Sequence, residues 1–151
     1  MAQSEADVAA TNMRLAATLC LQHARTPSQF EAAFAAAGFS VRDGLDAGVY
    51  VASAPGVGVL MVDPGTPEGF CRVESGLVSI ALARVIGDAI VAEYPAGAFQ
   101  PGWPGETASA PPPLCQGYVA WDARPIITIT YESAGNDADC VDRGNSAIVV
   151  D

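Results

Sequence analysis

The chain has 151 residues, of which 50% are hydrophobic and 16% are charged, and this composition excludes an intrinsically disordered protein. Its seven basic residues are all arginine, and seventeen acidic residues bring the formal net charge to −10. Such a chain has no basic patch that could neutralise phosphates, so the composition excludes a nucleic-acid-binding protein and attachment to anionic lipid head groups. The length is typical of one domain, and we predict a single domain over residues 1–151.

The first part of the chain carries the signals of two helices. Ser4 begins a capping-box pattern, which predicts a helix that runs to about Ala24. A proline at a first helical position and the glycine Gly38 after the last one predict a second helix over Pro27 to Ala37. We therefore expect a pair of N-terminal helices.

Hydrophobic residues then recur with the period of β-strands. Val49–Ser53 and Val57–Val62 flank a three-residue loop, Ala54–Gly56, and predict a β-hairpin. Phe70–Val73 is a third short strand on the same grounds.

The next segment has the pattern of a helix. It begins at Ser75 or Ser79, ends before Pro95, and is expected to be one long buried helix. Its expected buried face consists of Leu77, Val78, Ala81, Leu82, Val85, Ile86, Ala89 and Ile90.

The C-terminal part returns to strands, at Gln116–Trp121, Ile126–Glu132 and Ser146–Val150. With the elements above, this predicts an α+β fold in the order ααβββαβββ. We expect an antiparallel sheet of about five to six strands, with the helices packed mainly on one face.

Four cysteines are spread along the chain, at Cys20, Cys71, Cys115 and Cys140. None belongs to a Cys-x-x-Cys pair, so the spacing argues against a zinc site. Of the three possible connectivities we favour Cys20–Cys71 and Cys115–Cys140, and the alternative is four buried free thiols.

The start of the chain is polar and resembles the mature end that remains after a signal peptide is cleaved. Together with the expected disulfides, it predicts a periplasmic or extracellular bacterial protein whose secretion signal has been removed. A cytosolic protein is the alternative. No membrane span is expected, because the longest apolar region, Leu77–Tyr94, is interrupted by charged residues.

The sequence contains no catalytic motif. His23 is the one histidine, and its place near the expected end of the first helix fits a favourable interaction with the helix dipole. There is no Gly-x-Ser-x-Gly elbow and, without lysine, no Schiff-base or P-loop lysine. We therefore expect no catalytic residue and no cofactor.

An acidic cluster lies between the last two expected strands. Asp137, Asp139 and Asp142 could supply oxygen ligands for weak calcium binding, although the spacing departs from that of an EF-hand loop. The alternative is a solvated turn in which Arg143 pairs with one of the carboxylates.

Residues 96–114 form a loop rich in proline and glycine, and a loop of this length in a compact domain is often functional. Aromatic side chains on a stiff backbone are typical of interfaces. The candidate partner-binding residues are Phe99, Trp103, Pro111, Pro112 and Pro113. The alternative is a long crossover that Trp103 holds against the surface of the domain.

These features favour a non-enzymatic accessory or protein-interaction domain whose partner is a protein of the cell envelope. The main alternative is a small hydrolase or ligand-binding protein with a pocket between the long helix and the sheet. A calcium-stabilised extracellular module and a protease inhibitor that presents the proline-rich loop are further alternatives.

Overall fold

A computed structural model describes residues 3–23, 26–43, 46–64, 66–102, 113–124, 126–136 and 139–151. The elements, in chain order, are α1 (Glu5–Gln22), the 3₁₀ turn η1 (Pro27–Gln29), α2 (Phe30–Ala36), β1 (Ser40–Asp43), β2 (Val49–Ala54), β3 (Val57–Val62), β4 (Phe70–Ser75), α3 (Ile80–Val91), β5 (Gln100–Pro101), β6 (Tyr118–Ala120), β7 (Ile127–Glu132) and β8 (Ser146–Val150).

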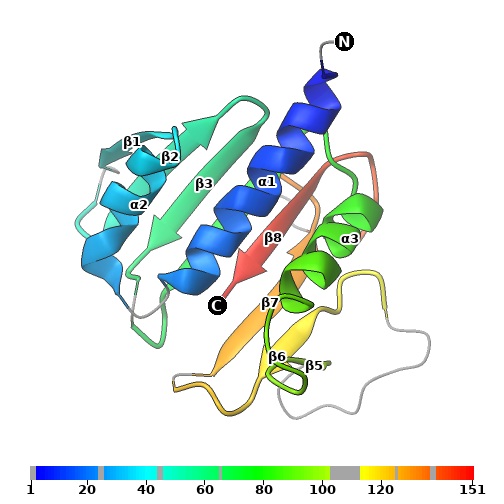
Figure 1. Ribbon diagram of the computed structural model, residues 1–151. Helices are drawn as coiled ribbons and strands as arrows, with labels where there is room; N and C mark the ends of the chain where they lie inside the picture. Colours follow the sequence, from blue (N-terminus) through cyan, green and yellow to red (C-terminus); the bar gives the residue numbers. More distant parts are fainter. Residues whose placement is uncertain are drawn as a thin grey trace.

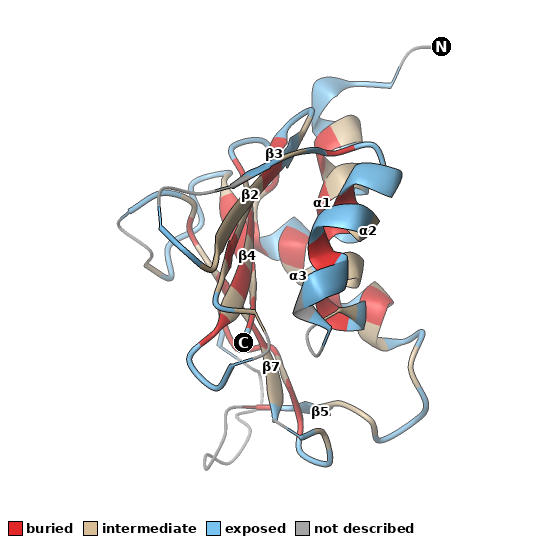
Figure 2. Cartoon of the chain, turned by 90° about the vertical axis from the view of Figure 1, so that its left-hand side faces the viewer, coloured by how far each residue is buried: buried red, intermediate tan, exposed pale blue. Residues whose placement is uncertain are grey.

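The fold is α+β, with an antiparallel sheet and its three α-helices on one side (Figures 1 and 2). The described strands form one eight-stranded sheet in the order β1-β2-β3-β4-β8-β7-β6-β5. Strands β1 to β4 follow one another as a meander, and so do β5 to β8. The last strand, β8, lies between β4 and β7 and joins the two halves.

The expected count of five to six strands and the order ααβββαβββ were wrong, because two edge strands were not recognised. β1 carries the polar residues Ser40, Arg42 and Asp43, and lacks a clear apolar alternation. β5 lies within the predicted loop 96–114 and contains a proline. Proline is tolerated at the edge of a sheet because an edge strand has backbone groups that pair with no neighbour.

The N-terminal helix packs along the centre of the sheet. Ser4 caps α1 by accepting a hydrogen bond from the Asp7 amide at 3.1 Å, as its position in the sequence predicts. The buried face of α1 consists of Ala9, Met13, Ala16, Ala17, Cys20 and Leu21. At Gly56 the β2–β3 turn comes so close to α1 that an added Cβ would lie 2.5 Å from the Cβ of Ala9. The hairpin loop has two residues rather than three, since Ala54 pairs with Val57.

The helix that we expected to be long and buried is shorter, and a different set of its residues faces the core. α3 begins after Ser79, whose hydroxyl accepts a hydrogen bond from the Leu82 amide at 3.1 Å. Its buried residues are Ile80, Ala83, Ile86, Gly87 and Ile90. Ala81, Leu82 and Val85, which we expected to be buried, are exposed, and Val85 is 61% exposed.

Both disulfides have the predicted connectivity. Cys20 of α1 is bonded to Cys71 of β4, and Cys115 is bonded to Cys140. The first pair joins a helix to the centre of the sheet in the hydrophobic core. The second joins the segment before β6 to the segment between β7 and β8. Two disulfides indicate an oxidising, non-cytoplasmic environment.

Candidate functional site

The two ends of the proline-rich segment lie side by side at one edge of the sheet. Gln100 pairs with Val119 and Pro101 pairs with Tyr118. The amide of Gly102 donates a further hydrogen bond to the carbonyl of Gly117, at 3.2 Å. The pairing of β5 with β6 thus holds the two described ends of the proline-rich segment next to each other (Figure 1).

Phe99 anchors the first end of this loop. Its ring is half-buried at the margin of the core and packs edge-on against Tyr94, with the ring centroids 5.2 Å apart. Phe99, one of the candidate partner-binding residues, therefore packs partly against its own domain. Trp103, Pro111 and Pro112 lie outside the described residues. Pro113 is exposed, and its carbonyl accepts a hydrogen bond from the Gln116 amide at 3.0 Å.

The second end is held more firmly. Cys115 is bonded to Cys140, and its carbonyl accepts a hydrogen bond from the Tyr131 amide at 3.1 Å. At Gly117 the chain lies so close to β7 that an added Cβ would be 1.9 Å from the carbonyl oxygen of Ile129. This position requires glycine, and the sequence alone offered no sign of it.

Two tyrosines lie between this edge of the sheet and α3. The Tyr118 hydroxyl donates a hydrogen bond to Asp88 Oδ1 at 2.7 Å. Burial, and to a smaller extent this hydrogen bond, raises the pKa of Tyr118 to about 12. Burial also raises the pKa of Tyr131 far above its ordinary value. Both phenols are therefore neutral near pH 7.

Within the described part of the chain, the Tyr131 hydroxyl and the Gln116 amide nitrogen are buried without a hydrogen-bond partner. Tyr131 meets α3 at Gly87, where an added Cβ would lie 2.0 Å from its hydroxyl oxygen. The helix and the sheet are therefore in direct contact at this point, with no space for a bound molecule between Gly87 and Tyr131.

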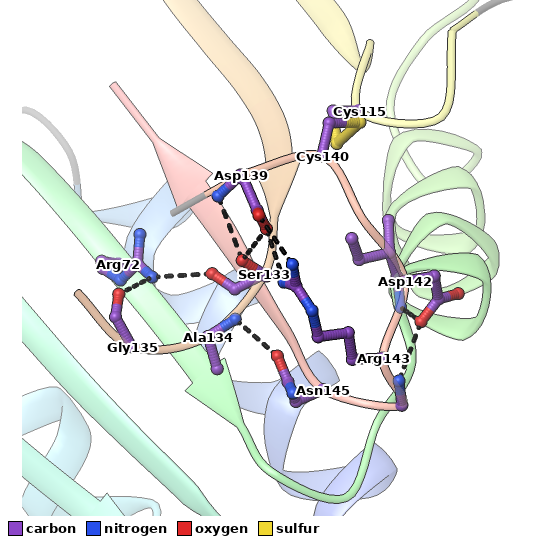
Figure 3. A network of polar contacts seen from close by, with 12 residues as sticks. Arg72, Cys115, Ser133, Ala134, Gly135, Asp139, Cys140, Asp142, Arg143 and Asn145 are labelled. Carbon is purple, nitrogen blue, oxygen red and sulfur yellow. Dashed lines mark hydrogen bonds and ion pairs between the residues drawn. A yellow bond between two sulfur atoms is a disulfide. The ribbon is translucent and has the colours of Figure 1, made fainter. Parts of the chain in front are cut away.

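The two described members of the acidic cluster, Asp139 and Asp142, bind different partners. Asp139 makes two hydrogen bonds with the Arg143 guanidinium, at 2.8 and 2.9 Å, and accepts a third from the Ser133 hydroxyl at 2.7 Å. These contacts, that from Arg143 above all, lower the pKa of Asp139 to about 2. Figure 3 shows the Asp139 carboxylate turned toward Ser133 and Arg143.

Asp142 caps α3 instead. Its carboxylate accepts hydrogen bonds from the amides of Ile80 and Ala81, each at 3.1 Å, and from the Gly144 amide at the same distance. These hydrogen bonds from backbone amides lower the pKa of Asp142, and the bond from Ala81 has the largest effect. Asp137 lies outside the described residues, and the remaining described residues contain no group of three potential metal-ligating side chains. The calcium site remains a prediction.

We expect Asp142→Ala to lower the free energy of unfolding by about 1 kcal/mol, because the amides of Ile80 and Ala81 lose an anionic acceptor at the positive end of a helix. Since folding lowers the pKa of Asp142, the contribution is present above the ordinary pKa of 3.8 and is lost as the pH falls through the lower folded value. Urea unfolding at neutral and acid pH measures both effects.

Asp122→Ala, in an exposed turn, is the control and should change stability little. Equal stability of wild type and Asp142→Ala at neutral pH would contradict the capping role.

His23 lies at the end of α1, as the sequence predicts. Its Nδ1 is 3.4 Å from the Thr26 hydroxyl, and its ring meets the edge of Phe30 with 6.3 Å between the centroids. Both contacts are local, and they position the ring at the helix end.

None of the helices in the described ranges is long and apolar enough to cross a membrane. The chain matches no known family model, no curated protein and no solved structure.

Proposed function

We propose that the chain is a non-enzymatic accessory or protein-interaction domain of the periplasm or the extracellular space, which binds a protein partner through residues 99–113. One observation carries the proposal: β5, β6 and the Cys115–Cys140 disulfide hold both ends of this segment on a rigid sheet. A loop with a rigid base is typical of binding sites that a scaffold presents.

The composition of the segment supports the same function. Proline restricts the backbone before binding, so less conformational entropy is lost when a partner docks. Proline-rich stretches are also recognised by aromatic grooves. Phe99 holds the start of the segment on Tyr94, and the segment contains a second aromatic residue, Trp103. The net charge of −10 orients a basic partner and repels acidic ones.

We expect Trp103→Ala to weaken binding to the partner by about 1–3 kcal/mol and to leave folding nearly intact, since interface tryptophans commonly contribute this much. The tagged chain is expressed with a secretion signal in its native cells and recovered from the envelope after gentle detergent extraction. The partner should co-purify in stoichiometric amount with wild type and be depleted with the variant.

Trp121→Ala is the matched control. Trp121 is 38% exposed in the turn after β6 and does not belong to the segment 99–113, so its loss should leave the partner bound. If Trp103→Ala lowers thermal stability as much as it lowers binding, Trp103 belongs to the core and the proposal fails.

A small hydrolase or ligand-binding protein with a pocket between α3 and the sheet is the second candidate. The direct contact of Gly87 with Tyr131, which leaves no space between α3 and the sheet at that point, favours the binding role over this one. Recovery of a clean protein without a partner would favour the second candidate, and ligand screens would follow. Incubation with a panel of proteases distinguishes an inhibitor from a loop that is simply cleaved.

A further inference from the structure

The face of the sheet that the helices leave uncovered carries apolar side chains on its central strands, around the ion-paired Arg72. In an antiparallel sheet with one open face, outward residues are ordinarily polar. Here the outward positions of the central strands include Val49, Val51, Leu60, Val62, Phe70 and Val149. β3 is therefore apolar on both faces, a pattern that is typical of strands covered from both sides. Figure 2 shows the helices on the other side of the sheet.

Two adjoining hollows lie on this face. Val51, Leu60, Gly135 and Asn136 line the first, and Leu60, Phe70 and Val149 line the second. Each has a volume of about 260 Å³, and they share Leu60 and Arg72. Each is smaller than the pockets that hold small molecules, which measure about 300–1,000 Å³. Shallow hollows that adjoin in this way fit successive side chains of a partner better than one small ligand.

The charges around the hollows are mainly negative. Arg72 is paired with Glu74 and Glu132, so its own charge is already balanced. Asp151 lines the second hollow without an ion pair among the described residues, and burial raises its pKa. The far edge of the face is positively charged, because Arg42 of β1 lies opposite Val51 of β2. A partner's basic group is therefore accommodated best at the Glu132 and Asp151 end.

A second copy of the chain is a poor occupant. Stacking two open faces would bring together two molecules that each carry a net charge of −10. Like charge of this size opposes association of the compact chains. The apolar centre and the acidic end favour a foreign segment that is apolar and basic.

We infer that the open face formed by β2, β3, β4 and β8 is a second docking surface, and that it binds a cationic amphipathic segment of a protein partner. Apolar side chains of that segment occupy the two hollows, and a Lys or Arg beside them pairs with the carboxylates of Glu132 and Asp151. This surface is on the other side of the sheet from α3 and does not depend on residues 99–113, so it extends the proposed function.

The test uses the full chain and a short synthetic peptide in which valine and lysine alternate. Amide chemical shifts of the isotope-labelled protein should move at Val51, Leu60, Phe70 and Val149 and stay unchanged along α3. Leu60→Asp should weaken binding by about tenfold or more, because it removes the apolar side chain that both hollows share and puts a carboxylate where an apolar side chain of the peptide would bury it. Leu60→Thr, which introduces a β-branched residue with high strand propensity, should weaken binding in the same direction if Leu60→Asp does not fold.

Three controls separate docking from general attraction to an acidic protein. Val85→Asp adds the same charge on the exposed face of α3 and should leave binding unchanged. A peptide with glutamate in place of lysine should not bind, and one with serine in place of valine should bind at least about tenfold more weakly. Equal binding of the serine peptide, equal binding to Leu60→Asp or Leu60→Thr, or shifts confined to α3 would overturn the inference. Dimerisation that Leu60→Asp abolishes, seen by sedimentation, would also overturn it, since a second copy would then be the occupant.

Discussion

Replacing Cys20 and Cys71 together with alanine is expected to lower the free energy of unfolding by about 4 kcal/mol. The disulfide joins residues 51 positions apart, and in the chain-entropy model a loop of this size restricts the unfolded chain by about that much. Domains are commonly stable by only about 5–15 kcal/mol, so the change is a large part of the total. Urea unfolding at equilibrium measures it, and the melting temperature should fall by roughly 8–16 °C.

The second disulfide provides the comparison. Cys115 and Cys140 are 25 positions apart, so their joint replacement with alanine should cost about 3.5 kcal/mol in the same model. This second replacement also releases one end of the proline-rich segment, and it should weaken partner binding, whereas loss of Cys20–Cys71 should not. If replacing Cys20 and Cys71 lowers the free energy of unfolding by less than about 1 kcal/mol, the unfolded chain is already restricted without this disulfide.

Arg72→Ala is expected to lower the free energy of unfolding by about 3 kcal/mol. The Arg72 side chain is only 14% exposed and forms ion pairs with Glu74 and Glu132. It also donates to the carbonyls of Ser133 and Gly135, at 3.1 and 3.2 Å, and so holds the start of the β7–β8 loop on the open face (Figure 3). Removal of one member of a partly buried network leaves the others without a partner.

Two further variants test this interpretation of Arg72. Arg72→Lys keeps the charge but not the planar fork, and should recover only part of the stability. Arg14→Ala removes an ion pair with Glu93 whose side chains are 48% and 55% exposed, and should cost less than about 1 kcal/mol. Faster hydrogen exchange at the Gly135 amide, which donates to Glu74, should accompany Arg72→Ala. Unchanged exchange would mean that Arg72 does not hold this loop.

Much of the local structure could be predicted from the sequence, because each signal acts within a few residues. Ser4 caps α1, Gly38 has the positive φ of a helix C-terminus, and the β2–β3 hairpin follows its alternating residues. The favoured disulfide pairing was also correct, although four cysteines allow three connectivities.

The acidic residues show where such reasoning ends. Asp139 and Asp142 are three positions apart, yet their carboxylates serve different partners. Asp142 caps a helix that begins 62 positions earlier in the chain. Spacing places residues on a segment, but the direction of each side chain depends on which element packs beside that segment.

By itself, the sequence determined the α+β class, the antiparallel pairing and the acidic character of the surface, because these depend on composition and short-range pattern. It favoured the observed disulfide pairing among three possible ones without deciding it. Only the tertiary structure decided the two edge strands, the buried side of α3 and the closed base of the proline-rich loop. Each depends on contacts between distant segments, such as β5 with β6 or Tyr131 with Gly87. The apolar open face arose in the same way: residues from β2, β3, β4 and β8 meet there through a pairing that no single segment encodes.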